Sequence, residues 1–441
     1  LHGYTSAAGD PEVRTRIASS LSRRFAIDCK GEELYLTCGA AASLVCCLHA
    51  LSEPGDEVVL IAPYFPEYVV FIRAAGGVVK ICPADIDTFQ INFQKLESLL
   101  TQRTKAVIIN SPNNPSGVLY DEKTLTYLGE LLGEKSRALG QPIYLISDEP
   151  YREIVFGGKT APWIPHFYPN TIVCYSWSKS LSLPGERIGY VYVPASAEQS
   201  KEVYSAIVGA GRKLGYVCAP SLIQRLVAAC CDLTADLSVY EKNARILTHS
   251  LRNLGYTCVV PGGTFYLFPK SLDEDDVAFA RAAQKMDLLL VPGSSFGCPG
   301  HVRISYCVPT EQIERSLAVF SRLAKKYLAS HDTPSSLRER GESISAKAVF
   351  DALKEGDAAA EAIVQEFSAY LGRALAVFAC VVDPEVIVVG GGVSKAGQIL
   401  IDGVAKYYRE AAFIACKDTP IVLASLGNDA GIYGAAKMLI D

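Results

Sequence analysis

The chain has 441 residues, of which 49% are hydrophobic and 20% charged, and this composition excludes a disordered or fibrous protein. Its 42 Lys and Arg against 47 Asp and Glu leave a net charge of −5, so we expect no nucleic acid and no anionic membrane among its partners. The longest apolar run, residues 374–382, is far shorter than the ~18 residues that a membrane span requires. At about 150 residues per domain, the length predicts roughly three domains.

The fourteen cysteines predict buried thiols in a reducing compartment. The chain has no CxxC motif, and Cys46-Cys47 and Cys230-Cys231 are adjacent pairs, which suit a disulfide framework poorly. The six histidines form no HExxH or similar pair, so we expect no metal site. A signal peptide is not recognisable, and the sequence therefore predicts a cytoplasmic protein. The first residue is Leu1 rather than Met, which indicates a trimmed start or a fragment.

Residues 1–195 carry the pattern of a large α/β domain. Short apolar runs recur between stretches long enough for helices, and several are apolar throughout, as in strands covered on both faces. They predict a doubly wound, mostly parallel sheet of seven strands. About a dozen residues separate the last two runs, too few for a comfortable crossover helix, so the last strand is expected to run antiparallel. The predicted strands are 34–37, 58–62, 78–82, 106–110, 143–147, 171–175 and 188–193.

Residues 196–329 predict a small α+β domain, residues 330–341 a polar linker, and residues 342–441 an incomplete α/β unit. The patterns in the small domain are helices at 198–214 and 221–254, a turn into a strand at 261–268, a strand at 302–307 and a helix ending near 328. The patterns in the last unit are helices at 345–355, 358–381 and 395–411, strands at 386–389 and 421–424, and Gly-rich turns at 390–392 and 427–431.

Candidate functional residues lie at the predicted strand ends, where open α/β sheets bind ligands. Lys179 follows a buried strand and is flanked by the hydroxyls of Ser176 and Ser178. As a neutral amine, a lysine forms a Schiff base with an aldehyde, and Arg187 could bind a phosphate. An ordinary surface lysine is the alternative interpretation.

Two further segments end buried strands. Asp148 could pair with a protonated ring nitrogen and Tyr151 could reach the same ligand, although Asp148 could instead cap a helix. The turn at 111–117 could direct the Asn114 amide at a ligand oxygen, or it could simply be a turn.

Three more signals have equally plain alternatives. The strand–glycine–helix junction at Gly39, Ala40 and Ala41 leaves free N–H groups that bind phosphate, but such junctions are common. Phe65 could stack on a planar ring or belong to the core. Arg303, inside an apolar strand, requires an anionic partner, either a substrate carboxylate or a structural ion pair.

Taken in order, these segments resemble the class I/II aminotransferases of the fold type I pyridoxal-phosphate superfamily over residues 1–329. The family pattern is NPxG at 114–117, DExY at 148–151, SxSK at 176–179, PGxRxG at 184–189 and a late RxS at 303–305. The resemblance implies an enzyme that uses pyridoxal 5′-phosphate to move an amino group between an L-amino acid and a 2-oxo acid. A lyase of the same fold stays open as an alternative, because relatives also catalyse β-elimination. A non-catalytic fusion or regulatory protein is a third interpretation.

The resemblance assigns a role to each cofactor residue. Lys179 forms the Schiff base with the cofactor and later moves the proton between the substrate Cα and the cofactor carbon. Asp148 keeps the pyridine nitrogen protonated, Asn114 and Tyr151 hydrogen-bond the ring oxygen, and Phe65 lies against the ring. The phosphate is held by Gly39, Ala40, Ala41, Ser176, Ser178 and Arg187.

The resemblance also covers the substrate and the subunits. Arg303 pairs with the substrate α-carboxylate, with Asn114 beside it, and Tyr4 reaches the phosphate of a neighbouring subunit, so a homodimer is expected. Family members begin with a further segment whose glycine-containing loop closes over the substrate, and this sequence lacks it. We expect that loss to weaken affinity and turnover if the whole protein shares it.

Residues from about 333 to 441 resemble the C-terminal end of ROK-family sugar kinases. The resemblance rests on 349–352, 354–357, the strand and Gly-rich turn at 386–394, and 426–431. The phosphate-binding loop, catalytic aspartate segment and zinc loop of those kinases have no counterpart here, so sugar phosphorylation is not expected. A passive remnant or fusion, natural or artefactual, is one interpretation, and a module that still binds a nucleotide is the other.

Overall fold

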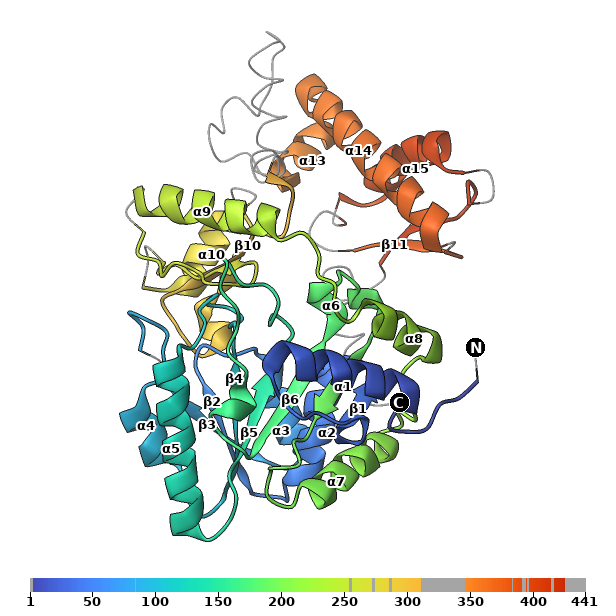
Figure 1. Cartoon of the computed structure of the whole chain (residues 1–441). Coiled ribbons are helices and arrows are strands. Elements are labelled where there is room, and N and C mark those ends of the chain that lie inside the picture. The colour runs from blue at the N-terminus through green and yellow to red at the C-terminus, as the bar shows by residue number, and fades with distance from the viewer. Residues whose placement is uncertain are drawn as a thin grey trace. The chain divides into compact units, whose positions relative to one another are not determined.

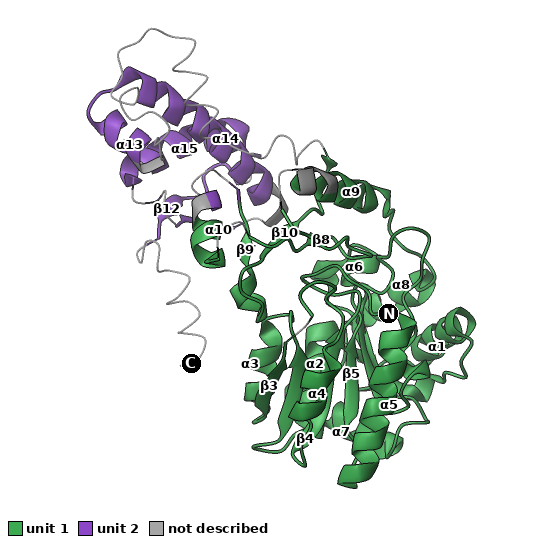
Figure 2. Cartoon of the chain, turned by 90° about the vertical axis from the view of Figure 1, so that its left-hand side faces the viewer, with its two compact units in different colours: residues 1–282, 289–313 green, residues 283–288, 314–441 purple. Residues whose placement is uncertain are grey.

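The computed structural model describes residues 3–83, 85–253, 256–271, 274–284, 288–310, 346–382, 384–390, 394, 396–413 and 416–424. The helix expected to end near 328, the linker at 330–341 and most of the two Gly-rich turns, at 391–392 and 427–431, lie outside these residues. The chain forms two compact units, residues 1–282 with 289–313 and residues 283–288 with 314–441 (Figure 2). The boundary at 195–196 inside the first unit stays a prediction.

The regular elements up to residue 310 alternate between strand and helix in the α/β part. The strands are β1 Leu34–Thr37, β2 Glu57–Ile61, β3 Val78–Cys82, β4 Thr104–Asn110, β5 Tyr144–Asp148, β6 Thr171–Ser176, β7 Gly189–Tyr192, β8 Tyr266–Leu267, β9 Val291–Pro292 and β10 Val302–Ser305. The helices are α1 Pro11–Phe25, α2 Ala40–Leu51, α3 Glu67–Ala74, α4 Phe93–Leu99, α5 Glu122–Leu139, α6 Trp177–Ser180, α7 Ser200–Lys213, α8 Ser221–Cys230, α9 Ser238–Asn253 and α10 Asp276–Gln284.

The first seven strands form one sheet in the order β1-β7-β6-β5-β4-β2-β3 (Figure 1). The neighbours from β6 to β3 pair in parallel, whereas β7 pairs antiparallel with both β6 and β1. The predicted mostly parallel sheet with an antiparallel last strand is therefore confirmed. The physical reason is the short connection: the chain between β6 and β7 holds only the one-turn helix α6 and a 3-10 turn at Pro184–Glu186, so it cannot cross over the sheet.

Strands β2, β5 and β6 are buried along their whole length, which explains why most of their residues are apolar. Val58 and Leu60 of β2 face one core with α2, α3 and α7, whereas Val59 and Ile61 face the other core with α4 and α5. Helices α1 and α8 cover a third cluster on β1 and β7. Each fully buried Val, Leu or Ile contributes about 1.5–3 kcal/mol relative to an exposed one, so this alternation sets the register of the sheet.

The small sheet of the first unit has the order β8-β10-β9 and is antiparallel. One expectation for this part of the chain was wrong. The helical pattern at 221–254 forms two helices, α8 and α9, with a break at 231–237. The apolar spacing runs through this break, but aspartate favours turns and caps over helix interiors. Asp236 accepts a hydrogen bond from the backbone N–H of Ser238 at 2.9 Å, so it starts α9 instead of continuing α8.

The described part of the second unit contains α13 Ala346–Lys354, α14 Ala358–Val382, α15 Gln398–Ala411 and a parallel pair of strands, β11 Ile387–Val389 and β12 Ile421–Leu423. Their bounds agree with the predicted ones within a few residues. Helices α14 and α15 approach closely at Gly372, where an added Cβ would lie 2.7 Å from the backbone nitrogen of Tyr408. Within the described residues, no helix of either unit combines the length and apolarity that a bilayer span requires.

Most of the described cysteines are buried. Cys47 on α2 and Cys174 on β6 have sulfur atoms 3.8 Å apart, far beyond the ~2.05 Å of a disulfide, and so form a thiol hydrogen bond. Burial raises the pKa of the neighbouring Cys46 thiol to about 12. Burial also raises the pKa of Cys174 well above its ordinary value, so the Cys46 and Cys174 thiols are neutral, unreactive core groups near pH 7.

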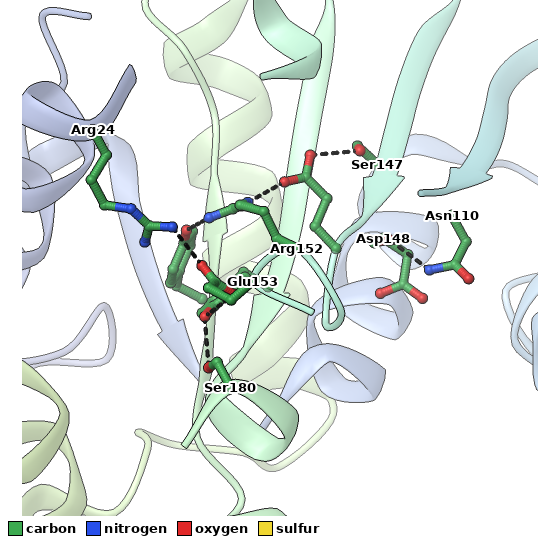
Figure 3. A network of polar contacts seen from close by, with 10 residues as sticks. Arg24, Asn110, Ser147, Asp148, Arg152, Glu153 and Ser180 are labelled. Atoms are coloured by element: carbon green, nitrogen blue, oxygen red, sulfur yellow. Dashed lines mark hydrogen bonds and ion pairs between the residues drawn. The ribbon is translucent and has the colours of Figure 1, made fainter. Parts of the chain in front are cut away.

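A buried ion pair lies in the segment that directly follows β5 (Figure 3). Arg152 Nε pairs with Glu149 Oε2 at 2.5 Å, and both side chains are almost fully buried. Arg152 also donates to the Tyr190 hydroxyl at 2.9 Å and lies over the Tyr175 ring, 4.5 Å from its centroid. The pair therefore fixes the segment after β5 against β6 and β7.

The same network extends to helices α1 and α6. The Tyr175 hydroxyl donates to Glu153 at 2.8 Å and lies 2.9 Å from Ser180 Oγ, the residue after Lys179. Arg24, near the end of α1, pairs with Glu153 at 2.9 Å (Figure 3). Four segments that are distant in sequence thus meet in one set of buried polar contacts.

Breaking this ion pair should cost far more than replacing it. We expect Arg152→Met to lower the free energy of unfolding by about 3–5 kcal/mol, because it leaves the buried Glu149 charge without its cation and with only the Ser147 hydroxyl among its described partners. The double variant Glu149→Leu/Arg152→Met should lose less than the single one. Urea unfolding followed by tryptophan fluorescence measures this, since the two tryptophans, Trp163 and Trp177, both lie in the first unit.

The matched control is Lys30→Met, because Lys30 pairs with Asp28 at an exposed position and such pairs contribute at most about 1 kcal/mol. Equal losses in the Arg152→Met single variant and the double variant would contradict the assignment of the ion pair.

Candidate functional site

The sheet brings the predicted site residues to one edge. The parallel strands β4, β5 and β6 end at Asn110, Asp148 and Ser176, so their carboxyl ends lie side by side. Strand β7 runs in the opposite direction and starts at Gly189. Arg187, two residues before this start, therefore lies at the same edge. Topology alone therefore explains why motifs far apart in sequence meet.

A cavity of about 320 Å³ opens at this edge, within the range of small-molecule sites. Its lining contains nearly all of the predicted residues together with five others. The predicted ones are Ala40, Ala41, Phe65, Asn114, Asp148, Tyr151, Ser176, Ser178, Lys179, Arg187 and Arg303. The others are Leu44, Asn110, Pro150, Pro184 and Tyr266.

Two of the predicted site residues do not line the cavity. Gly39 lies next to the guanidinium of Arg187, which does line the cavity. Tyr4 is 91% exposed and does not reach the cavity of its own chain. A larger open groove of about 810 Å³ lies along α9, but it contains none of the predicted residues, and we do not assign the chemistry to it.

Asp148 is buried with only one of its carboxylate oxygens bonded. Oδ2 accepts a hydrogen bond from the Tyr68 hydroxyl at 2.5 Å, while Oδ1 has no partner among the described residues. Burial raises the pKa of Asp148 to about 7, although the Tyr68 hydrogen bond opposes the shift. The chain after Asp148 forms turns, so the helix-cap alternative does not apply. An unbonded oxygen on a buried carboxylate requires a donor from a ligand.

An asparagine relay joins Asp148 to Arg303. Asn110 Nδ2 donates to the Asp148 carbonyl at 2.7 Å, and Asn110 Oδ1 accepts from the Asn114 backbone N–H at 2.6 Å. Asn114 Oδ1 in turn accepts from Arg303 Nη1 at 3.0 Å. The Asn114 amide nitrogen is thereby turned away from Arg303.

Lys179 lies on the single turn of α6 and is half-buried, which does not fit an ordinary surface lysine. Ser176 caps this turn: its Oγ accepts from the Ser178 backbone N–H at 3.0 Å. Burial lowers the pKa of the Lys179 amine, and the nearby Arg187 charge lowers it further, whereas Cys307 raises it. A lysine with a lowered pKa has more of the neutral amine that attacks an aldehyde.

The start of α2 forms an anion site with Arg187. Gly39 is the N-cap of α2, with φ +94° and no side-chain cap, so the first N–H groups of the helix stay available at Ala40 and Ala41. The φ of +94° favours glycine at this position, and a Cβ there would also lie 2.8 Å from Arg187 Nη2 and displace the guanidinium. Arg187 itself has φ +49°, a left-handed conformation that is uncommon for residues other than glycine.

Arg303 lies between aromatic rings. Its guanidinium carbon is 4.5 Å from the centroid of the Tyr266 ring and 4.9 Å from that of Phe296. The Tyr151 hydroxyl donates to the Tyr266 hydroxyl at 3.4 Å. Phe65 also lines the cavity and packs edge-on against Tyr68.

Sequence reasoning missed Tyr68, Asn110 and Tyr266. Asn110 could have been found, since it is a polar residue at the end of an apolar strand, as Asp148 is. Tyr68 lies in the first turn of α3, but the sequence does not show which strand end this helix meets. Tyr266 carries no signal beyond its place in an aromatic strand.

Comparison with known proteins agrees with this geometry. The family described as aminotransferase class I and II matches residues 1–320, and the ROK family matches residues 320–441. A probable aspartate/prephenate aminotransferase of Thermus aquaticus is 30% identical over 329 residues, which cover 72% of this chain and 83% of that protein. An aspartate aminotransferase of Thermotoga maritima is 31% identical over 320 residues, 71% of this chain and 81% of that protein.

Solved structures give the same result. The crystal structure of an aminotransferase from Eubacterium rectale has 51% sequence identity and a TM-score of 0.70, and the match covers 74% of this chain and 82% of that one. The aspartate aminotransferase of Thermotoga maritima has 30% identity and a TM-score of 0.65, with 74% and 84% covered. Most of this chain thus has the fold type I architecture, and it belongs to the aminotransferase class I and II family of pyridoxal-phosphate-dependent transaminases.

Proposed function

We propose that the cavity holds pyridoxal 5′-phosphate on Lys179 through a Schiff base, and that the chain moves an amino group between an L-amino acid and a 2-oxo acid. The observation that carries this proposal is the pairing of Asp148 and Lys179 in one cavity. One is a buried carboxylate with an unbonded oxygen, and the other is an amine with a lowered pKa. The first suits a protonated ring nitrogen and the second suits an aldehyde.

The residues present fit the whole cofactor. Asp148 Oδ1 would bind the ring nitrogen, the start of α2 with Arg187 would bind the phosphate, and Phe65 would lie against the ring. When bound, the protonated ring accepts electron density from the substrate Cα. The Lys179 amine would move the proton at that carbon, and Asn114 with Tyr151 would hydrogen-bond the ring oxygen.

Arg303 supports the choice of an α-amino acid as substrate. Its guanidinium lies in the cavity and makes no ion pair within the described residues, so it can bind a carboxylate with two parallel hydrogen bonds. The named relatives act on aspartate, and we therefore propose L-aspartate with 2-oxoglutarate as the first pair to assay. Transamination differs from elimination because it yields a new amino acid and no ammonia.

We also propose a homodimer in which Tyr4 of one subunit reaches the phosphate site of the other. Tyr4 is 91% exposed, and Arg187 is exposed at the mouth of its own cavity. If so, Tyr4→Phe should weaken cofactor binding by about tenfold, the loss of one hydrogen bond to a charged group. Mixing Tyr4→Phe and Lys179→Ala chains should restore one wild-type site per mixed dimer. Sedimentation of a monomer that binds cofactor at wild-type affinity would contradict this proposal.

The link to Lys179 can be tested by reduction. Wild-type protein treated with pyridoxal phosphate and borohydride should carry one reduced cofactor on Lys179, because reduction makes the Schiff-base bond permanent. Lys179→Ala should bind the cofactor without covalent attachment. Peptide mass spectrometry locates the modification. Labelling of another lysine, or equal labelling of the Ala variant, would refute the assignment.

The buried Asp148 predicts a pH-dependent stability of the cofactor-free protein. Its folded pKa of about 7 lies above the ~3.9 of an unfolded chain, so the folded state holds the proton more tightly. Stability should therefore fall as the pH rises from about 4 to about 7, and level off above. Asp148→Asn should remove this loss, and bound cofactor should reduce it, because the ring-nitrogen charge lowers the pKa of Asp148.

Urea unfolding at several pH values measures the effect. The control is Asp28→Asn, since that aspartate side chain is 90% exposed. If the Asp28 and Asp148 variants have the same pH profile as the wild type, the interpretation of Asp148 is wrong.

A further inference from the structure

Tyr266 contacts two groups to which the proposed function gives separate tasks. It belongs to β8, is 9% exposed and lines the cavity. Its ring lies 4.5 Å from the Arg303 guanidinium carbon, and its hydroxyl accepts the hydrogen bond of Tyr151. One side chain therefore reaches both the arginine assigned to the substrate carboxylate and the phenol assigned to the cofactor ring oxygen.

The Tyr266 ring contacts the Arg303 guanidinium without neutralising its positive charge. Tyr266 and Phe296 contact the guanidinium, and no carboxylate lies within 4.0 Å of it in the described part of the chain. Only Nη1 is engaged, by Asn114 Oδ1. Stacking on a ring face restrains the plane of a guanidinium while its N–H edge stays available, whereas an acidic partner would occupy that edge.

The hydroxyl controls where the Tyr151 proton points. Tyr151 donates to Tyr266 at 3.4 Å, a long hydrogen bond, so the Tyr266 hydroxyl and a cofactor ring oxygen would compete for the same proton. Burial and this hydrogen bond both raise the pKa of Tyr151 well above its ordinary value, which keeps the phenol neutral. Without the Tyr266 hydroxyl, the proton becomes free to bind another acceptor.

We propose that Tyr266 is a positioning residue with two separable parts: its ring orients Arg303 toward the α-carboxylate of the substrate, and its hydroxyl competes with the cofactor ring oxygen for the Tyr151 proton. This inference rests on the proposed function. Loss of the ring and loss of the hydroxyl should therefore have different effects.

The ring is tested by comparing Tyr266→Leu with Tyr266→Phe. Tyr266→Leu should raise the KM for an L-amino acid about tenfold with little change in kcat, whereas Tyr266→Phe, which keeps the ring, should leave KM nearly unchanged. Binding of a non-reacting carboxylate such as maleate, followed through the cofactor absorbance, should weaken by the same factor in the Leu variant. Reaction with the corresponding amine, which has no carboxylate, should be unaffected. An equal loss with the amine would overturn the role of the ring.

The hydroxyl is tested by the pH titration of the cofactor absorbance band. In Tyr266→Phe the freed Tyr151 proton stabilises negative charge on the cofactor ring oxygen, so the midpoint should fall by about half a unit to one unit. Tyr306→Phe is the matched control, because it removes a buried hydroxyl that donates to the Thr264 carbonyl at 3.4 Å. An unchanged midpoint, or an equal shift in the control, would overturn the role of the hydroxyl. A wild-type protein with no absorbance band would instead refute the proposed function itself.

Discussion

The half-satisfied carboxylate of Asp148 is the constraint on which the site depends. A carboxylate at the end of a buried strand is costly when charged, and within the residues that the structure describes only the Tyr68 hydrogen bond compensates it directly. The second oxygen has no partner among the described residues, and Asp148 lines the cavity that also contains Lys179, Arg187 and Arg303. The unbonded carboxylate oxygen destabilises the protein when the cavity is empty. A cationic group of a ligand bound beside Asp148 would offset this cost.

Residues 148–152 contribute both to the cavity and to the buried ion pair. Asp148 and Tyr151 face the cavity, whereas Glu149 and Arg152 belong to the buried ion pair behind it. The network reaches Ser180, the neighbour of Lys179, through the Tyr175 hydroxyl. The acid, the phenol and the lysine are therefore all attached to a buried polar framework, which restricts their movement relative to one another.

Much of this arrangement could be predicted from sequence, because it follows from local patterns and from topology. The seven apolar runs became the seven strands, and the short connection at 177–188 made the last one antiparallel. Residues placed at strand ends met in one cavity because parallel strands end at one edge. The break between α8 and α9 was missed since the apolar spacing continues through it, and aspartate caps compete with the helix only locally.

Contacts between segments could not be predicted in the same way. Nothing in the sequence pairs Tyr68 with Asp148 or Tyr266 with Arg303, because these pairs arise from packing across the sheet edge. The most direct measurement of the central claim is the ¹⁵N chemical shift of the ring nitrogen in bound, labelled pyridoxal phosphate. The proposed pairing of Asp148 with this nitrogen predicts a protonated nitrogen in the wild type well above neutral pH, and an unprotonated one in Asp148→Asn. An unprotonated nitrogen in the wild type at neutral pH would contradict it.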